Sequence, residues 1–195
     1  MSWGERVFER FLALDAHLVT KGFPATSPWW KETIRRWLTS GKRQLVARVG
    51  RRGGKSSTLT RLGVVLALFG EHQVPPGDVG TVAVVSVSRS EANQRLRLIK
   101  AVLDGLGEPY APTDGGIELE RRPFAFRIFT CSIGAVSGFT AVAVIADEVS
   151  KWRAADDGAN PAKEVLGSIR PTMATMPNAR IVLSSSPFGF EDEHA

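Results

Sequence analysis

The stretch Val49-Gly50-Arg51-Arg52-Gly53-Gly54-Lys55-Ser56-Ser57 decides the fold class of this 195-residue chain. It follows a short β-rich run, residues 44–49, and opens a mostly apolar helical pattern over residues 55–69. A glycine-rich turn between a strand and a helix is the context of a phosphate-binding loop. There, successive backbone N–H groups and the positive end of the helix hold the anion. The stretch therefore predicts an α/β fold organised around phosphate binding.

Each residue type in this loop suits a part of nucleotide chemistry. Gly53 and Gly54 tolerate a tight turn, the Lys55 ammonium suits the β- and γ-phosphates, and the Ser56 hydroxyl suits Mg²⁺. The pattern G-x-x-x-x-G-K-[ST] would place its first glycine at position 49, where this sequence has Val49. A basic surface loop without a ligand is the alternative. The candidates for nucleotide binding are Gly50, Arg51, Arg52, Gly53, Gly54, Lys55, Ser56 and Ser57.

A second signal is the run Ala141-Val-Ala-Val-Ile-Ala-Asp147-Glu148. An apolar run that ends in carboxylates is typical of a strand buried on both faces, with functional residues at its carboxyl end. Asp147 is the candidate to hold Mg²⁺ together with Ser56, and Glu148 the candidate to orient and deprotonate the attacking water. An Asp-Glu pair alone is common, but together with the loop at 49–57 it indicates nucleotide hydrolysis.

A third signal is the apolar run at 181–183 followed by Ser184, Ser185, Ser186 and Pro187. Consecutive hydroxyls at the end of a strand are candidates to sense the state of the γ-phosphate and to relay it. A strand followed by an ordinary Ser-Pro turn is the alternative.

The remaining chain alternates between predicted strands and helices. Helices are expected over 3–19, 28–39, from Ser90 to about residue 103, and near 162–169; strands over 81–87, 117–120, 124–130 and 180–185; and a loop over 105–116. Trp29, Trp30 and Trp37 are expected to pack rather than to stack on bases. This alternation predicts a three-layer α/β fold with a mostly parallel central sheet. We expect residues 1–40 to form a helical segment that packs on a core comprising residues 41–195.

The net positive charge lies in the first third of the chain, whereas the rest carries a net negative charge. Residues 1–61 contain 13 Lys/Arg against 4 Asp/Glu, and residues 62–195 contain 12 against 16. This distribution indicates an anionic partner, nucleotide or nucleic acid, with a solvated basic face as the alternative. A basic cluster comprises Arg35, Arg36, Lys42 and Arg43. It either contacts the phosphate backbone of DNA or faces an adjacent subunit or solvent.

Composition excludes several other classes of protein. The single cysteine, Cys131, excludes an intramolecular disulfide framework, and three histidines with one cysteine make a structural zinc site unexpected. The longest apolar stretch, residues 63–69, is far too short to span a membrane. The N-terminus carries acidic residues and no long apolar core, so we expect neither a secretory signal nor membrane association.

In this order, the three signals resemble the ATPase domain of the terminase large subunit, the DNA-packaging motor of tailed bacteriophages. The resemblance covers residues from about 25 to 190 and rests on the arginines ahead of Gly-Lys-Ser, on VSGFTAVAVIADEVSKW at 136–152 and on LSSSPFG at 183–189. It implies a RecA-like P-loop NTPase of the additional-strand catalytic-glutamate type. It also implies Mg-dependent ATP hydrolysis that drives sequence-independent translocation of double-stranded DNA into a procapsid.

The resemblance also implies roles and partners. Arg51 would be the loop arginine near the phosphates, catalytic together with Lys55 and Glu148. The portal protein, the small terminase subunit and a homo-oligomeric ring in the host cytoplasm are implied partners and setting, with a monomer as the alternative in isolation. Such proteins continue into a lid region and an RNase H-like nuclease, whereas this chain ends a few residues after Gly189. We therefore expect ATPase but no nuclease activity.

Two departures from the family pattern concern the adenine and the arginine finger. The family often has a glutamine upstream of the loop, but residues 28–33 contain none. Many relatives carry an arginine before the glycine that precedes the Asp-Glu strand, where this chain has Ser137. A finger would then come from elsewhere, and the unranked candidates are Arg121, Arg122, Arg127 and Arg153.

Two other functions remain open on sequence. A RecA-like helicase or other nucleic-acid translocase also has Asp-Glu after a strand, although the serine triplet and the arginine-rich loop favour the terminase interpretation. A nucleotide-binding module without turnover is the other alternative. Glu148 argues against it, because binding alone needs no carboxylate that activates water.

Overall fold

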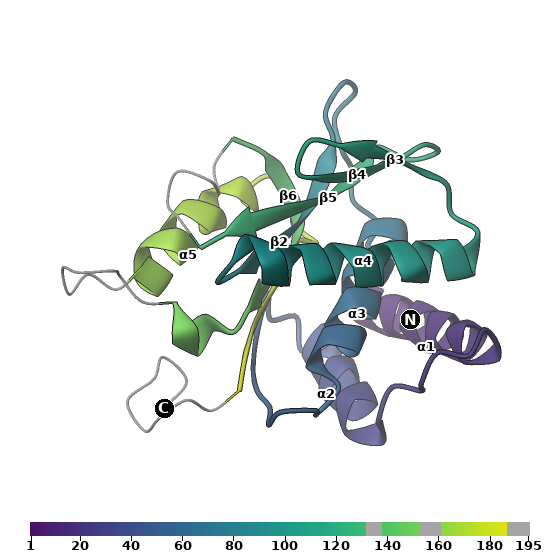
Figure 1. Cartoon of the computed structure of the whole chain (residues 1–195). Helices are drawn as coiled ribbons and strands as arrows, with labels where there is room; N and C mark the ends of the chain where they lie inside the picture. Colours follow the sequence, from purple (N-terminus) through teal and green to yellow (C-terminus); the bar gives the residue numbers. More distant parts are fainter. Residues whose placement is uncertain (132–137, 153–160, 187–195) are drawn as a thin grey trace.

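The structure, a computed structural model of the chain, describes residues 1–131, 138–152 and 161–186. A seven-stranded sheet lies at its centre (Figure 1). In spatial order the strands are β1 (Gln44–Arg48), β7 (Arg180–Ser185), β6 (Thr140–Asp147), β2 (Gly80–Ser86), β5 (Phe124–Thr130), β4 (Gly116–Leu119) and β3 (Tyr110–Thr113). The first five strands pair in parallel, β4 pairs antiparallel with β5, and β3 pairs antiparallel with β4. The predicted α/β fold with a mostly parallel sheet is confirmed.

Strand β7 lies between β1 and β6, although it comes last in the chain. Ser184 aligns with Ala47 of β1 on one side and with Asp147 of β6 on the other. An added strand thus separates the strand before the glycine-rich loop from the strand that ends in Asp147, as expected of the additional-strand type. Because the three strands are parallel, their carboxyl ends meet at one edge of the sheet, and the three sequence signals lie there together.

Helices α3 (Lys55–Phe69) and α4 (Arg89–Leu106) cover one face of the sheet. Helix α3 contacts β2 and β6, α4 contacts β2 and β5, and the two helices contact each other (Figure 1). Gly63 permits the close approach of α3, since a Cβ at this position would lie 2.8 Å from Cδ1 of Ile145. The apolar side chains of α3 therefore stabilise the strand that carries Asp147.

Helices α1 (Trp3–Thr20) and α2 (Pro28–Thr39) form an outer layer, in which they contact each other and α1 contacts α3. Helix α2 begins as predicted, with Ser27 as its N-cap and Pro28 in its first turn. Trp30 and Trp37 are buried, and Trp29, although 54% exposed, packs edge-on against the Trp30 ring with 4.9 Å between the ring centroids. Successive helical residues point about 100° apart, and the apolar face of α2 includes Trp30 but not its neighbour.

Two predicted boundaries need correction. The N-cap of α4 is Ser88, whose Oγ accepts a hydrogen bond from the Glu91 amide, and not Ser90. The expected loop at 105–116 contains the end of α4 and also strand β3, which pairs with β4 across a turn at Asp114 and Gly115. Proline at position 112 is compatible with β3 because the strand lies at the edge of the sheet, where a missing N–H breaks no ladder.

The last elements are the short 3₁₀ helix η2 (Val149–Lys151), directly after β6, and α5 (Pro161–Thr172), which precedes β7. None of the helices in the described parts of the chain is long and apolar enough to cross a membrane.

Candidate functional site

The glycine-rich loop joins β1 to the N-terminus of α3 in the conformation that its glycines predict. Arg52 and Gly54 have positive φ angles, +62° and +74°, and the Gly53 amide donates to the Gly50 carbonyl over 3.1 Å. A Cβ at Gly53 would lie 2.5 Å from Cγ1 of Val49, so any larger residue would displace the loop. No side chain caps the N-terminus of α3, and its first amides remain available for an anion.

Lys55, the first residue of α3, is buried and points back beneath the loop. Its Nζ donates to the Val49 carbonyl over 3.0 Å and to Oγ of Ser186 over 2.6 Å, and it lies 3.5 Å from Oε1 of Glu148. One ammonium thus contacts the loop, the end of β7 and the residue after β6. The structure brings all three sequence signals into contact at this atom.

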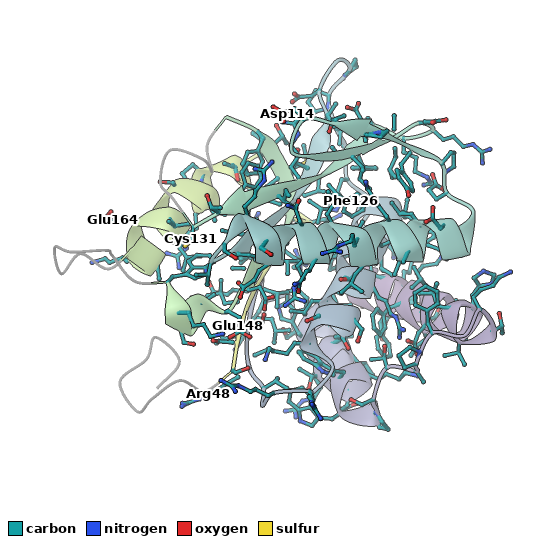
Figure 2. The ribbon with its side chains drawn as sticks, viewed as in Figure 1. Arg48, Asp114, Phe126, Cys131, Glu148 and Glu164 are labelled. Atoms are coloured by element: carbon teal, nitrogen blue, oxygen red, sulfur yellow. The ribbon has the colours of Figure 1, made fainter. Side chains whose placement is uncertain are left out.

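Glu148 follows β6 with a left-handed backbone, φ +51°, which turns the chain into η2. Its Oε2 accepts from the Ser186 amide over 3.4 Å and lies 3.3 Å from Nζ of Lys151. Burial opposes ionisation, but the charge of Lys55, the Ser186 amide and Lys151 outweigh it, so the pKa of Glu148 lies below its ordinary value. Figure 2 shows Glu148 at the same end of the molecule as Arg48, the last residue of β1.

Asp147, the last residue of β6, is buried and fully hydrogen-bonded. Its Oδ1 accepts from Oγ of Ser184 over 3.0 Å and from the Glu148 amide over 3.1 Å. Its Oδ2 accepts from Nε of Arg95 over 2.6 Å and also from Nη2 of the same guanidinium. Sequence reasoning missed Arg95, because an arginine on an amphipathic helix carries no signal that distinguishes a buried partner from a solvated side chain.

The three serines at the end of β7 contact three different parts of the site. Ser184 donates to Asp147, Ser185 hydrogen-bonds to Oγ of Ser150 in η2, and Ser186 accepts from Lys55. All three are buried. An ordinary Ser-Pro turn would leave such hydroxyls in solvent, so their burial and hydrogen bonds argue against that alternative. Pro187, Phe188 and Gly189, the last residues of the third motif, lie outside the described residues.

A cavity of 420 Å³ opens over these groups. It is lined by Arg51, Arg52, Gly53, Gly54, Lys55, Ser56, Ser57, Leu98, Glu148 and Ser186. The lining includes seven of the eight loop residues predicted from sequence; Gly50 takes part through its carbonyl bond to Gly53. Lined by cations and by the N-terminus of a helix, this cavity suits a polyphosphate.

Ser56 and Asp147 together line a second, smaller cavity beside the first. A hydroxyl and a carboxylate are hard oxygen donors, the type that Mg²⁺ prefers. The described parts of the chain contain no group of three or more His, Cys, Asp or Glu side chains that would hold a metal ion without help. The donor set therefore fits a metal ion that shares its shell with phosphate oxygens, as Mg²⁺ does in nucleotide sites.

Trp30 of α2 supports the loop from the N-terminal layer. Its Nε1 donates to the Gly53 carbonyl over 2.8 Å, and a Cβ at Gly54 would lie within 3.8 Å of its ring. The sequence places the Trp-Trp pair in the stretch where the related family often has a glutamine, but no pattern predicts this hydrogen bond. Trp30 thus couples α2 to the phosphate-binding loop.

The four residues of the basic cluster have different surroundings in the structure. Arg43 donates to the carbonyls of Met173, Met176 and Ala179, so its guanidinium stabilises the turn after α5. Arg35 pairs with Glu32 on the surface. Lys42 and Arg36 are exposed.

Three of the four candidates for an arginine finger lie in the described part of the chain, and none of the three lines the 420 Å³ cavity. Arg122 donates to the Leu68 carbonyl and pairs with Glu108. Arg121 is exposed and Arg127 is half-buried on β5, and neither lines the 420 Å³ cavity. Arg153 lies outside the described residues.

Comparison with known proteins identifies the fold. No protein-family model and no curated protein matches the sequence. Among solved structures, the HK97 bacteriophage large terminase is 17% identical, with a TM-score of 0.69 over 95% of this chain and 38% of that one. The ATPase domain of the large terminase of Thermus phage P74-26 is 16% identical, with a TM-score of 0.54 over 76% of this chain and 62% of that one.

A further similar structure comes from outside phages. S. cerevisiae Dbp5, solved bound to Nup159, Gle1, IP6 and ADP, is 14% identical, with a TM-score of 0.58 over 91% of this chain and 46% of that one. The chain thus has the fold shared by terminase ATPase domains and RecA-like DEAD-box helicases, as the resemblance implied. It spans less than two thirds of the length of each of these proteins.

Proposed function

We propose that this chain is a Mg-dependent ATP hydrolase that powers translocation of double-stranded DNA, as in a terminase large subunit. The observation that carries the proposal is the contact of Lys55 with Ser186 and Glu148. It joins a phosphate-binding loop, a carboxylate and the candidate coupling strand at one cavity. A fold of this kind supports a nucleotide-driven motor, and the site residues supply its chemistry.

Phosphate binding is assigned to the loop and the start of α3. Backbone amides at the N-terminus of α3 and the Lys55 ammonium would hold the β- and γ-phosphates. Arg51 and Arg52 line the same cavity, and we assign Arg51 the task of stabilising negative charge as the γ-phosphate leaves. Lys55 would exchange its contacts with Val49 and Ser186 for phosphate oxygens.

Hydrolysis is assigned to Glu148, which lies at the mouth of the cavity and is ionised at neutral pH. An ionised carboxylate in this place can accept the proton of a water aligned with the γ-phosphate. The Ser186 amide and hydroxyl lie within 3.5 Å of that carboxylate. Any change in the position of Glu148 or Lys55 during turnover therefore reaches β7 directly, which is the proposed coupling role of Ser184, Ser185 and Ser186.

Ser56 and Asp147 are assigned to the metal. When bound there, Mg²⁺ would neutralise charge on the β- and γ-phosphate oxygens. Ser56 would ligate it from the first turn of α3, and Asp147 would orient its shell from the end of β6. Ser184 and the Glu148 amide hold the Asp147 carboxylate in place for this task.

By analogy with terminases, the proposal includes double-stranded DNA as substrate and the portal protein and small subunit as partners. It also includes a ring on the procapsid and a place in the host cytoplasm. We likewise propose residues 1–40 as a helical layer on a core of residues 41–195. The likeness to Dbp5 favours a RecA-like helicase as the second candidate. Double-stranded DNA that stimulates ATP hydrolysis without strand separation would support the packaging motor, whereas unwinding would support the helicase.

The test measures phosphate release from ATP by the wild type, Lys55→Ala and Glu148→Gln, with Glu120→Gln, an exposed glutamate, as the matched control. We expect Glu148→Gln to lose about 10²–10⁴-fold in rate while it still binds nucleotide. Lys55→Ala should lose nucleotide affinity as well. A Glu148→Gln variant that hydrolyses ATP at the wild-type rate would contradict the assignment. If the wild type is folded and binds nucleotide but is as inactive as both variants, the chain is a binding module without turnover.

A further inference from the structure

The Asp147 carboxylate has every acceptor position filled by the protein. A carboxylate has about four lone-pair positions, two on each oxygen. Ser184 and the Glu148 amide use those of Oδ1, and the Nε and Nη2 groups of Arg95 use those of Oδ2. A metal ion, or a water in its shell, therefore reaches Asp147 only if one of these donors leaves.

Arg95 is the donor suited to leave. The Ser184 hydroxyl is buried between β6 and β7, and the Glu148 amide belongs to the main chain. Arg95 reaches Asp147 on a long side chain from α4 that retains 19% exposure. It is also the one positively charged group among the three, so a divalent cation would repel it while it attracts the carboxylate.

The space beside Asp147 leads to the same conclusion. The cavity beside Asp147 has a volume of only 10 Å³, and its lining is Ser56, Leu59, Thr60, Val84, Arg95, Ile99, Ile145 and Asp147. That is about the space for one water, whereas Mg²⁺ keeps an octahedral shell with several waters or phosphate oxygens. The cavity therefore has no room for such a shell while Arg95 lines it.

We propose that Arg95 and the divalent cation compete for Asp147, so that the metal enters this site only as the guanidinium leaves Oδ2. The proposal rests on the proposed nucleotide site. Arg95 is a positioning residue: it keeps a buried carboxylate neutralised and oriented, and it sets the concentration of Mg²⁺ that the site requires. Because α4 also places Leu98 in the wall of the nucleotide cavity, metal entry would be felt along this helix.

The experiment titrates Mg²⁺ into the protein at a fixed concentration of fluorescent ADP and compares the wild type with Arg95→Gln. Arg97→Gln, which removes an exposed arginine two residues further along α4, is the matched control. We expect the Mg²⁺ concentration at half-saturation to fall about tenfold in Arg95→Gln and to stay unchanged in Arg97→Gln. An unchanged or higher Mg²⁺ requirement in a folded Arg95→Gln protein would overturn the proposal.

A second measurement uses NMR spectroscopy and follows the Arg95 side chain in the wild-type protein. In wild-type protein labelled with ¹⁵N at arginine Nε, the Arg95 signal, assigned with Arg95→Lys, should move toward that of a solvated guanidinium when Mg²⁺ and ADP are added. If ADP binds with Mg²⁺ and the signal does not move, the competition is wrong while the nucleotide site stands. If ADP and Mg²⁺ do not bind the wild type at all, the proposed function fails and the competition with it.

Discussion

In the described part of the chain, two arginine–aspartate ion pairs involve a buried aspartate, and their surroundings differ. Arg61 of α3 meets Asp15 of α1 with side chains 2% and 1% exposed, whereas Arg95 of α4 meets Asp147 of β6 with 19% and 4%. The first pair joins α1 of the outer layer to α3, which covers the sheet. The second lies where the strands end, beside the candidate nucleotide cavity.

The enclosed pair belongs to a closed network of hydrogen bonds. Arg61 also donates to Oγ1 of Thr26 over 2.9 Å and to the Pro24 carbonyl over 2.7 Å, and Lys31 lies 2.9 Å from the other oxygen of Asp15. Burial raises the pKa of Asp15, but the hydrogen bonds from Thr26 and Lys31 and the charge of Arg61 together outweigh it. The pKa of Asp15 therefore lies below its ordinary value. These contacts tie α1 and the segment before α2 to α3. The comparison teaches that the same two side chains serve a fixed contact in one place and an exchangeable one in the other.

The largest expected difference in stability comes from breaking the enclosed pair. Arg61→Met leaves the Asp15 carboxylate buried with a lost partner, which should lower the free energy of unfolding by about 3–5 kcal/mol. Arg95→Met should lower it less, because the Arg95 side chain is 19% exposed, against 2% for Arg61. Urea unfolding of both variants measures the difference, and equal losses would remove the distinction between the two pairs.

The acid side of the stability profile depends on His72, which lies near the start of the segment between α3 and β2. Burial lowers the pKa of His72 to about 4, although its Nε2 lies 3.0 Å from the Leu66 carbonyl. The unfolded chain binds this proton near pH 6.5, so stability is fully present above that pH and is lost as the pH falls toward 4.

The loss through this window should reach about 3 kcal/mol, and His72→Gln should remove most of it. Urea unfolding at pH 4.5 and 7.5 measures the effect. Since Asp15 has a lowered pKa, the enclosed pair should lose its contribution only below this window, and an unchanged pH dependence in His72→Gln would contradict the assignment.

Trp30 contacts the glycine-rich loop from α2, and its replacement should weaken nucleotide binding by a small amount. Trp30→Phe keeps the ring packing but deletes the donor to the Gly53 carbonyl, which should cost about 1 kcal/mol, or roughly fivefold in the Kd for ADP. Fluorescent ADP titration measures this change. Trp37→Phe is the control, because Trp37 is a buried tryptophan of the same helix whose Nε1 has no hydrogen-bond partner in the described part of the chain. Equal affinity of the two variants would show that α2 does not position the loop.

The smallest effect is expected at the surface pair of Arg35 and Glu32. Both side chains are about half exposed, so their charges are well hydrated without each other. Arg35→Gln should leave the urea midpoint unchanged within error. A clear loss of stability there would show that exposure is a poor guide to which ion pairs hold this fold.

The sequence by itself determined the elements of the site and their order. Helix α3, beginning at Lys55, and strand β7 have the predicted bounds, because a glycine-rich turn and a buried apolar run are local patterns. The pattern of Asp147 and Glu148 after a strand likewise placed two carboxylates at the carboxyl end of β6. The resemblance carried by these motifs anticipated the fold that the similar structures share.

Only the tertiary structure decided which side chains meet. Sequence separation is 52 residues between Arg95 and Asp147 and 23 between Trp30 and Gly53, and neither contact leaves a periodic pattern. Likewise, the sequence does not indicate that Arg43 of the basic cluster donates to the carbonyls of the turn after α5. Local sequence sets the conformation of each segment, whereas the partner of a long charged side chain depends on which strand is inserted next to which. For Arg43, the pairing of β7 with β1 makes that choice, because it brings the turn that precedes β7 next to the start of β1.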